Sequence, residues 1–377
     1  MIRILFLIPT LSGGGAEKVL RTMVNHMDLS RFDITVQTVE ACDPERYLKN
    51  GIHYKAINRC KTAIGRKLFR GFYRLCAECG LAYPLFIKDD YDIEVAYLET
   101  EATKLIAQST NRNAAKLAWV HCDLSCKEGI VQKREKIEKQ YRHFDRVVCV
   151  SGDVEKGFEE LFGKGFPTQV LHNVIDEEEI FAKAEAFPVS WERPGVTQLL
   201  AVGRLSREKN YPALFSCCAR LKQAGYPFHL TVLGDGLEAE RLKAEICTMD
   251  LCEEISLQGF SENPYPWMRE ADVVVCTSLY EGLSTVIQEA MILGRAIVTT
   301  PVGGMRELLG DSEYGLITTD WEDGLSSDLA RMIRDPELRK HYAEKAKRHM
   351  EQHGKTYAIE ELSAFFEERF REKRSKQ

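Results

Sequence analysis

The sequence has little that would point to a membrane-spanning, secreted or nucleic-acid-binding protein. No apolar run approaches the roughly 18 residues that a membrane-spanning helix needs. The first residues, MIRILFLIP, lack a small-residue cleavage site after a long apolar region, so we interpret them as a buried strand rather than a signal peptide. A net charge of −6 gives no general reason to expect a nucleic-acid partner.

The 12 cysteines lack the pattern of a disulfide framework. Most lie in predicted strands and helices of a large chain, as reduced thiols do in cytoplasmic proteins. Cys76-x2-Cys79 and Cys122-x3-Cys126 could together supply four zinc ligands. The first pair lies in a helix-like stretch and the second lacks the usual knuckle glycines, so we expect no metal site and a cytoplasmic location.

A chain of 377 residues exceeds what one hydrophobic core usually supports, and we expect two domains. The helical pattern breaks at 187–195, FPVSWERPG, which predicts a linker and domains over 1–188 and 189–355. Residues 356–377 form a last helix, expected to pack back on the first domain. Strands alternate with helices throughout, which predicts parallel, doubly wound sheets that bind ligands at the carboxyl ends of their strands.

The stretch 276–294, CTSLYEGLSTVIQEAMILG, follows a buried strand and opens into a helix that Ser284 or Thr285 could cap. Such a helix N-terminus at the end of a strand favours an anion. Glu281 and Glu289 flank the expected anion site, and carboxylates accept hydrogen bonds from sugar and ribose hydroxyls. Taken alone, the two glutamates could equally belong to a solvated helix.

Three further loops follow predicted strands. Arg204 and Lys209 lie after the strand 198–202, where a guanidinium and an ammonium could neutralise a diphosphate. Gly13-Gly14-Gly15 follows the first strand without Walker spacing, and lets the backbone approach a ligand or simply makes a tight turn. His121 follows the strand 116–120, where a neutral imidazole could accept the proton of a hydroxyl.

A competing hypothesis comes from Gly234-Asp235-Gly236, which with Ala239 makes a nominal dinucleotide fingerprint of an NAD-dependent dehydrogenase. That fingerprint needs an acidic residue at the tip of the following strand. The strand ends instead in Gln258-Gly259-Phe260, and Glu262 lies beyond the tip. We therefore expect Gly234 to admit a nucleotide of another kind.

Several of these stretches resemble the motifs of retaining GT-B glycosyltransferases of family 4, the group that includes capsule, exopolysaccharide and O-antigen enzymes. The resemblance covers nearly the whole chain and is strongest in the second domain. It is weaker at 172–176, where the usual glycine is missing. The motifs are Gly13–Glu17, Trp119-Val120-His121-Cys122-Asp123, Gly203-Arg204-Leu205 with Lys209-Asn210, Glu281 with Glu289, and Pro301–Glu307.

The resemblance implies a GT-B fold, in which two Rossmann-like domains face each other across a cleft. It places Glu281 on the donor sugar, Glu289 on the ribose, and His121 toward the acceptor, with Asp123 as its orienting partner or as an alternative base. The other residues that it implies are Gly14, Gly15, Arg204, Lys209, Leu283, Ser284 and Thr285 at the donor diphosphate, and Gly234 and Phe260 at the nucleotide.

The implied activity is transfer of a hexose or N-acetylhexosamine, with retention, from a nucleotide sugar to a hydroxyl of a saccharide. UDP is the nucleotide most common in the family, and a polyprenyl-diphosphate-linked saccharide is the acceptor that we expect. No cofactor or metal is expected, because Asp90-Tyr91-Asp92 precedes its strand instead of following it. A nucleotide-sugar epimerase or hydrolase and a non-catalytic nucleotide-sugar-binding subunit remain alternatives.

The segment 46–77 is basic and amphipathic within an otherwise acidic chain. We expect it either to bind an anionic membrane surface, which would make the protein peripheral on the inner face of the plasma membrane, or to form an ordinary helix with its apolar face in the core. Nucleic-acid binding is disfavoured because there is no other basic tract. Its basic residues are Arg46, Lys49, Lys55, Arg59, Lys61, Arg66, Lys67, Arg70 and Arg74.

Overall fold

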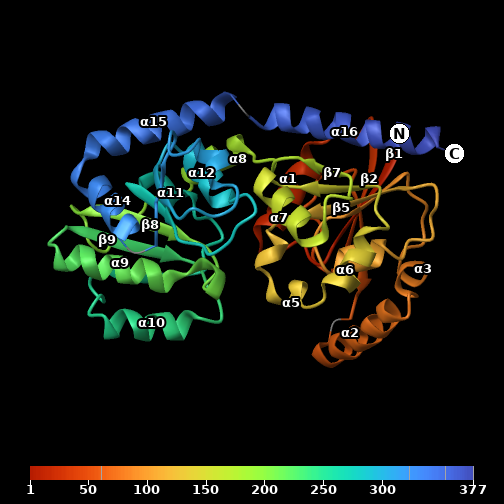
Figure 1. Cartoon of the computed structure of the whole chain (residues 1–377), viewed down its shortest axis with the longest axis horizontal. Helices are drawn as coiled ribbons and strands as arrows, with labels where there is room; N and C mark the ends of the chain where they lie inside the picture. Colours follow the sequence, from red (N-terminus) through yellow and green to blue (C-terminus); the bar gives the residue numbers. More distant parts are fainter. Residues whose placement is uncertain (61, 322, 353, 377) are drawn as a thin grey trace. The chain divides into compact units, whose positions relative to one another are not determined.

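The computed structural model describes residues 1–60, 62–321, 323–352 and 354–376. The chain forms two compact units, Met1–Val174 with Thr356–Gln377 and Ile175–Lys355 (Figure 1). The linker predicted at 187–195 therefore lies inside the second unit. The physical reason is the helix α8 (Glu177–Ala184), which packs against two helices of that unit, α11 (Tyr265–Glu270) and α12 (Thr285–Ile292).

The first unit is built on a seven-stranded parallel sheet in the order β3-β2-β1-β4-β5-β6-β7. Its first strand is buried from Ile4 to Ile8 because helices cover both faces of a parallel sheet. The chain runs from β1 outward through β2 to β3, and then returns to form β4 on the other side of β1. The direction of winding therefore reverses between β1 and β4, which makes this pair the topological switch point of the sheet. The strands are β1 (Ile2–Ile8), β2 (Phe32–Glu40), β3 (His53–Asn58), β4 (Ile93–Ala96), β5 (Ala115–Val120), β6 (Arg146–Cys149) and β7 (Thr168–Val170).

Helices of very different length surround this sheet. The last helix, α16, packs on it through Phe366, whose ring centroid lies 5.7 Å from that of Phe6 and 6.1 Å from that of Trp119. The contact with Phe6 is edge-to-face and the contact with Trp119 is tilted, and both add to the burial of the rings. The helices are α1 (Gly15–His26), α2 (Ala63–Glu78), α3 (Ala82–Phe86), α4 (Glu101–Ile106), α5 (Glu128–Val131), α6 (Arg134–Tyr141), α7 (Gly152–Phe162) and α16 (Lys355–Ser375).

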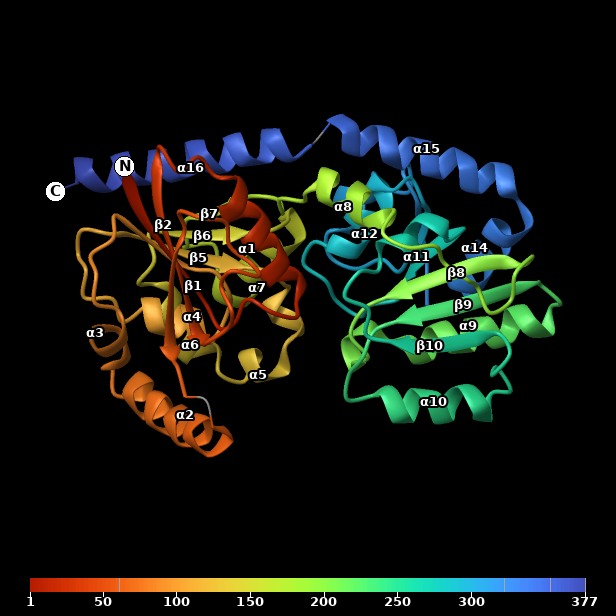
Figure 2. The same ribbon diagram turned by 180° about the vertical axis from the view of Figure 1, so that it is seen from behind.

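The second unit contains a six-stranded parallel sheet in the order β10-β9-β8-β11-β12-β13. Figure 2 shows β8, β9 and β10 side by side, with α9 and α10 beyond them. Here β8 and β11 are the neighbours at which the direction of winding reverses. The elements are β8 (Thr197–Val202), α9 (Tyr211–Gln223), β9 (Phe228–Leu233), α10 (Ala239–Thr248), β10 (Ile255–Gly259), β11 (Val273–Cys276), β12 (Ala296–Thr299), α13 (Met305–Leu309), β13 (Leu316–Ile317), α14 (Asp323–Arg334) and α15 (Pro336–Gln352).

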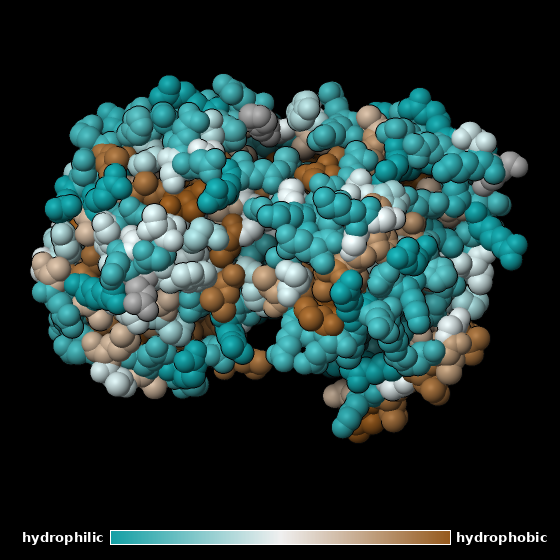
Figure 3. Space-filling view, viewed as in Figure 1, coloured by the Kyte–Doolittle hydropathy of each residue, from teal (hydrophilic) through white to brown (hydrophobic). Residues whose placement is uncertain are grey.

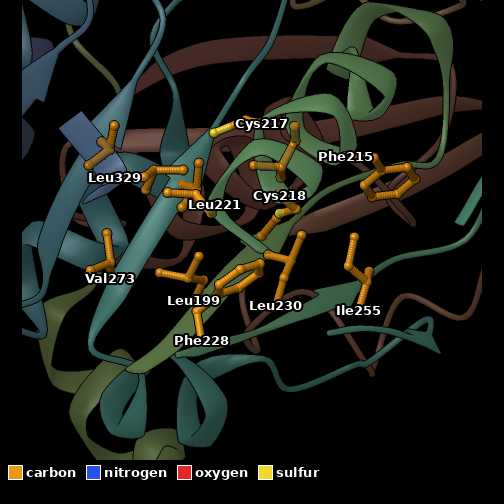
Figure 4. Close-up of a cluster of buried hydrophobic side chains, with 14 of the residues drawn as sticks. Leu199, Phe215, Cys217, Cys218, Leu221, Phe228, Leu230, Ile255, Val273 and Leu329 are labelled. Carbon is orange, nitrogen blue, oxygen red and sulfur yellow. The ribbon is translucent and has the colours of Figure 1, made fainter. Parts of the chain in front are cut away.

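The core of the second unit lies between its sheet and the helices α9 and α14 (Figure 4). In α9, Leu214, Cys217, Cys218 and Leu221 are buried at the spacing of one helical face. Burial raises the pKa of the Cys217 thiol to about 11, so this cysteine behaves as a small apolar side chain. The described part of the chain contains no helix with the length and apolar character that crossing a membrane requires.

Candidate functional site

The switch point of the second unit carries an ion pair between two loops. Lys209 lies on the loop after β8 and Glu281 on the loop after β11, and Lys209 Nζ is 2.6 Å from Glu281 Oε1. Ser278 Oγ donates to the same carboxylate oxygen, also at 2.6 Å. Burial alone would lower the pKa of the Lys209 ammonium, but the Glu281 charge and its hydrogen bond outweigh burial and raise that pKa. A charged lysine is thus held at the edge of the sheet where α/β proteins bind ligands.

The two loops are also joined through their backbones. Leu279 N donates to the carbonyl of Glu208 at 2.7 Å, and Thr277 Oγ1 donates to the carbonyl of Lys209 at 3.0 Å. Arg204 lies on the same loop as Lys209 and is exposed. Its guanidinium makes no hydrogen bond or ion pair to the described residues. It can therefore turn toward an anion that approaches this edge.

A helix N-terminus faces the same edge. Ser284 caps α12 by accepting a hydrogen bond from Ile287 N at 3.4 Å, and Leu283 before it is buried. Thr285 is the first residue of the helix, so the first free amides of α12 lie beside the Glu281 loop. Glu289 is buried further along α12 and accepts a hydrogen bond from Tyr265 Oη at 3.3 Å. The strand, loop and helix predicted over 276–294 are all present.

The glycines of the nominal dinucleotide fingerprint are explained by packing. A Cβ atom at Gly234 would clash with the carbonyl of Gly203, and one at Gly236 would clash with the carbonyl of Leu205. The loops after β8 and β9 therefore touch backbone to backbone, which only glycine permits. Close packing of these two loops accounts for the motif without a dinucleotide.

Phe260 follows β10 and is 70% exposed. It is therefore not part of the hydrophobic core. Its ring is available for contact with a flat ligand such as a nucleotide base.

In the first unit, the glycine loop lies between β1 and α1. Gly13 has a φ of +95°, a conformation that other residues rarely adopt. Gly14 is the N-cap of α1 and Gly15 its first residue, and the Glu17 carboxylate lies against Gly14. The first amides of α1 lie at the carboxyl edge of β1, next to the switch point of the first sheet.

His121 follows β5 and rests on Tyr97, with ring centroids 4.8 Å apart. Its Nε2 is 2.9 Å from the Tyr97 carbonyl oxygen. A carbonyl can only accept, so Nε2 carries the hydrogen in the neutral ring and Nδ1 keeps a lone pair. Burial lowers the pKa of His121, although the nearby Glu99 carboxylate acts in the opposite direction. The neutral imidazole can accept a proton at Nδ1.

The hydrogen bonds of the Asp123 carboxylate lie within its own loop and do not involve the His121 imidazole. Its carboxylate accepts hydrogen bonds from Ser125 N at 2.9 Å and Ser125 Oγ at 2.6 Å, which caps a short 3₁₀ turn, Leu124–Cys126. It also lies against α7 at Gly157, where a Cβ atom would clash with Asp123 Oδ1. This carboxylate joins the His121 loop to α7.

The sequence analysis missed Glu99, which directly supports the His121 loop. Glu99 is buried just after β4, and its Oε1 accepts hydrogen bonds from His121 N at 2.5 Å and from Cys122 N at 3.1 Å. The next residue, Thr100, has a φ of +75°, a strained conformation for a β-branched residue. A carboxylate directly after a predicted strand was the only signal in the sequence, because the pairing of β4 with β1 and β5 cannot be seen there.

The chain is similar to known proteins in sequence and in fold. Residues 182–349, most of the second unit, match the family model described as glycosyl transferases group 1. Over 181 residues, or 48% of each chain, the sequence is 36% identical to the N-acetylgalactosamine-N,N'-diacetylbacillosaminyl-diphospho-undecaprenol 4-alpha-N-acetylgalactosaminyltransferase of Campylobacter jejuni. That match spans about half the length of this relative.

A second protein of Campylobacter jejuni matches over 92% of this chain and 93% of its own, at 23% identity. It is the GalNAc-alpha-(1->4)-GalNAc-alpha-(1->3)-diNAcBac-PP-undecaprenol alpha-1,4-N-acetyl-D-galactosaminyltransferase. This longer match includes the first unit as well as the second.

Two solved structures share the fold. HepE of Anabaena, in complex with UDP and glucose, superposes with a TM-score of 0.76 at 20% identity over 98% of this chain and 100% of its own. Sucrose-phosphate synthase of Thermosynechococcus elongatus gives 0.79 at 17% identity over 98% and 99%. The predicted fold class, GT-B with two doubly wound parallel α/β domains, is confirmed. The chain thus has the GT-B fold, and its residues 182–349 match the family model of the glycosyl transferases of group 1.

Proposed function

We propose that the protein is a retaining glycosyltransferase that moves a hexose or N-acetylhexosamine from a UDP-sugar to a hydroxyl of a lipid-linked saccharide in bacterial surface polysaccharide assembly. The observation that carries the proposal is the Lys209–Glu281 pair at the switch point of the second unit, beside the N-terminus of α12. The pair offers a cation for a diphosphate and a carboxylate for the sugar next to it. The match of residues 182–349 to the family model of group 1 glycosyl transferases supports the class of reaction.

The donor diphosphate would be bound by charge. Lys209 and Arg204 supply two cations, and the amides at Leu283, Ser284 and Thr285 add the positive end of α12. These charges also stabilise the diphosphate as it leaves, which is the main catalytic contribution that we assign to the second unit. Because these groups can carry that charge, we propose that transfer needs no metal ion.

The sugar and the nucleoside would be held by the remaining residues. Oε1 of Glu281 is occupied by Lys209 and Ser278, while Oε2 makes no hydrogen bond to the described residues and can accept one from a sugar hydroxyl. Glu289 would bind the ribose, and Phe260 with Gly234 would lie beside the base. UDP is proposed as the nucleotide because HepE, with the same fold, was solved with UDP.

The acceptor would bind to the first unit. Nδ1 of His121 is the free basic atom there, and it can orient the incoming hydroxyl or take its proton. Asp123 and Glu99 keep the His121 loop in place. The glycine loop at Gly14 and Gly15 would approach the phosphates with its backbone amides.

A polyprenyl-diphosphate-linked saccharide is the proposed acceptor, because both Campylobacter relatives are named for acceptors linked to undecaprenol through a diphosphate. Such an acceptor keeps its sugar at the surface of a bilayer. We therefore propose that the protein is cytoplasmic and attaches peripherally to the anionic inner face of the plasma membrane, through the segment 46–77.

The proposal is tested by a donor screen. Thermal shift or calorimetry would compare UDP-, GDP- and ADP-sugars with NAD(H), in the presence of EDTA. We expect one nucleotide sugar to stabilise the protein selectively, and Glu289→Ala to remove that stabilisation because the ribose contact is lost. Stabilisation by NAD(H) alone would overturn the proposal. Scrambling of the donor in the absence of any acceptor would identify an epimerase instead, and binding without turnover a non-catalytic subunit.

A further inference from the structure

The helix α2 exposes an apolar face. Ile64, Leu68, Phe72 and Leu75 are 75%, 71%, 52% and 63% exposed, and their spacing puts them on one side of the helix. We call these four residues the α2 stripe. Figure 3 shows brown side chains gathered at the lower right, where Figure 1 places α2. Single exposed leucines are common, but a continuous apolar row along a helix marks an interaction surface.

A neighbouring face of α2 attaches the helix to the first unit. Tyr73, Cys76 and Ala77 are buried, and the ring of Phe86 in α3 lies 5.8 Å from the rings of Phe69 and Tyr73. One interpretation of the sequence is that the apolar residues of this segment pack in the core. This is correct for Tyr73, Cys76 and Ala77 but not for the α2 stripe, which is exposed. Of the four stripe residues, Phe72 also packs edge-on against Phe86, with ring centroids 6.4 Å apart, while Ile64, Leu68 and Leu75 are more than half exposed.

Two basic side chains border the stripe. Lys67 and Arg74 are exposed, lie on one side of the helix at a spacing of two turns, and are next to Leu68 and Leu75 in the sequence. Arg70 is engaged elsewhere, because its Nε donates to Glu40 Oε1 at 2.8 Å. An apolar row with cationic side chains at its edge is the arrangement of a helix that lies in the interface of a bilayer.

The rest of the basic segment does not belong to this surface. Residues 53–58 form β3, the edge strand that pairs with β2, and Lys55 there forms an ion pair with Asp89. Lys61 lies outside the described residues. The candidate membrane-binding surface is therefore α2 alone, and not the whole segment 46–77 that was predicted from the sequence.

We propose that α2 docks the protein on an anionic lipid bilayer, with the α2 stripe among the acyl chains just below the headgroups and with Lys67 and Arg74 against the lipid phosphates. The inference deepens the proposed function, because it names the surface that brings the first unit to a lipid-linked acceptor. A second copy of the chain fits this face less well. Two α2 helices paired through the stripe would bring Lys67 and Arg74 of one copy close to those of the other, and like charges repel.

Co-sedimentation of the full-length protein with vesicles tests the inference, without donor or acceptor. One set of vesicles holds equal parts of phosphatidylglycerol and phosphatidylcholine, and the other pure phosphatidylcholine. We expect binding to the anionic set at low salt and weaker binding at high salt, because the headgroup attraction is screened. Leu68→Ser with Leu75→Ser should weaken binding by roughly tenfold for each leucine that no longer enters the bilayer. Lys67→Gln with Arg74→Gln should weaken it by roughly fivefold for each charge.

Matched controls separate docking from general effects. Leu237→Ser removes an exposed leucine of the second unit, and Lys164→Gln with Lys243→Gln changes the net charge by the same amount as the basic pair. Both should bind vesicles as the unchanged protein does. The inference is overturned if the unchanged protein stays in solution at low salt, if the stripe variant binds normally, or if light scattering shows that the stripe holds dimers together instead.

The vesicle-binding results test membrane docking separately from the proposed glycosyltransferase activity. The stripe variant should keep its thermal stabilisation by the nucleotide sugar, because α2 belongs to the first unit and the donor residues to the second. Normal vesicle binding by a protein that no nucleotide sugar stabilises would instead retain α2 as a docking helix and reject the glycosyltransferase proposal.

Discussion

The Lys209 ammonium and the Glu281 carboxylate meet at 2.6 Å between the loops that follow β8 and β11. The Glu281 carboxylate favours the charged form of Lys209, and the contact holds both side chains in place before any ligand arrives. A cation held in this way needs little rearrangement to receive a diphosphate, which is what makes preorganised charge effective in catalysis. Four experiments test the roles proposed for this pair and for other residues in each of the two units.

Removing either cation should slow transfer more than it weakens folding. Lys209→Ala and Arg204→Ala should each lower kcat/KM by about 10²–10³, because each deletes a charge that stabilises the departing diphosphate. Arg207→Ala is the matched control, since Arg207 is an exposed arginine on the same loop. Steady-state kinetics of the folded variants measure these changes in kcat/KM. Unchanged turnover in both cation variants would remove the diphosphate assignment.

The ion pair should contribute to stability in a pH-dependent way. The pKa of Lys209 is raised in the folded protein, so the pair's stabilisation is fully present below the ordinary lysine pKa of about 10.4 and is lost as pH rises through the folded pKa. Glu281→Gln should therefore lower the free energy of unfolding by about 1–3 kcal/mol at pH 8, and by less near pH 11.

Chemical denaturation at the two pH values measures this difference. Glu344→Gln breaks the exposed pair between Glu344 and Arg348 and should cost at most about 0.5 kcal/mol at either pH. An equal loss for Glu281→Gln at pH 8 and pH 11 would contradict the pairing.

Glu99 should tune the proton affinity of His121. The pKa of His121 is lowered by burial, and the Glu99 charge partly offsets this effect; Lys127 opposes Glu99. Glu99→Gln keeps an oxygen for the His121 and Cys122 amides but removes the charge, so the pKa of His121 should fall further. The acid limb of kcat/KM should move to lower pH, and the NMR titration of the imidazole should move with it.

A second variant separates charge from support of the loop. Glu99→Ala removes both and should lower kcat as well, whereas Glu101→Gln, a neighbouring exposed glutamate, should change neither the titration nor the rate. The folded pKa of His121 itself lies below the unfolded value of about 6.5. The neutral imidazole therefore contributes stability above about pH 6.5, and this contribution is lost as the pH falls through the folded pKa. An unmoved imidazole titration in Glu99→Gln would reject the tuning role.

The contact between the loops after β8 and β9 should tolerate no side chain at Gly234. Gly234→Ala would push a Cβ atom into the Gly203 carbonyl, and we expect a loss of about 2–3 kcal/mol with weaker nucleotide-sugar binding. Gly165→Ala is the control, because an added Cβ meets no atom there. Thermal unfolding and donor titration measure both effects, and a Gly234→Ala protein as stable as the control would show that the two loops can separate freely.

The order of local elements could be predicted from the sequence. The apolar run before Glu281, the capping residue Ser284 and the helix behind it follow from neighbouring residues alone, and the structure contains all three. The same holds for the loops of Gly14, Lys209 and His121, each of which follows a strand. Local periodicity and capping act within a few residues, which is why the sequence is sufficient for them.

Only the tertiary structure decided which of these loops meet. The order of strands makes β8 a neighbour of β11, and this brings Lys209 to Glu281 across a long separation in the chain. The contact of Glu99 with the His121 loop depends in the same way on β4 lying next to β5. The exposed face of α2 could not be told from a core face, because both have the same apolar spacing. Whether an apolar residue is buried depends on what packs over it, and that is set by the whole fold.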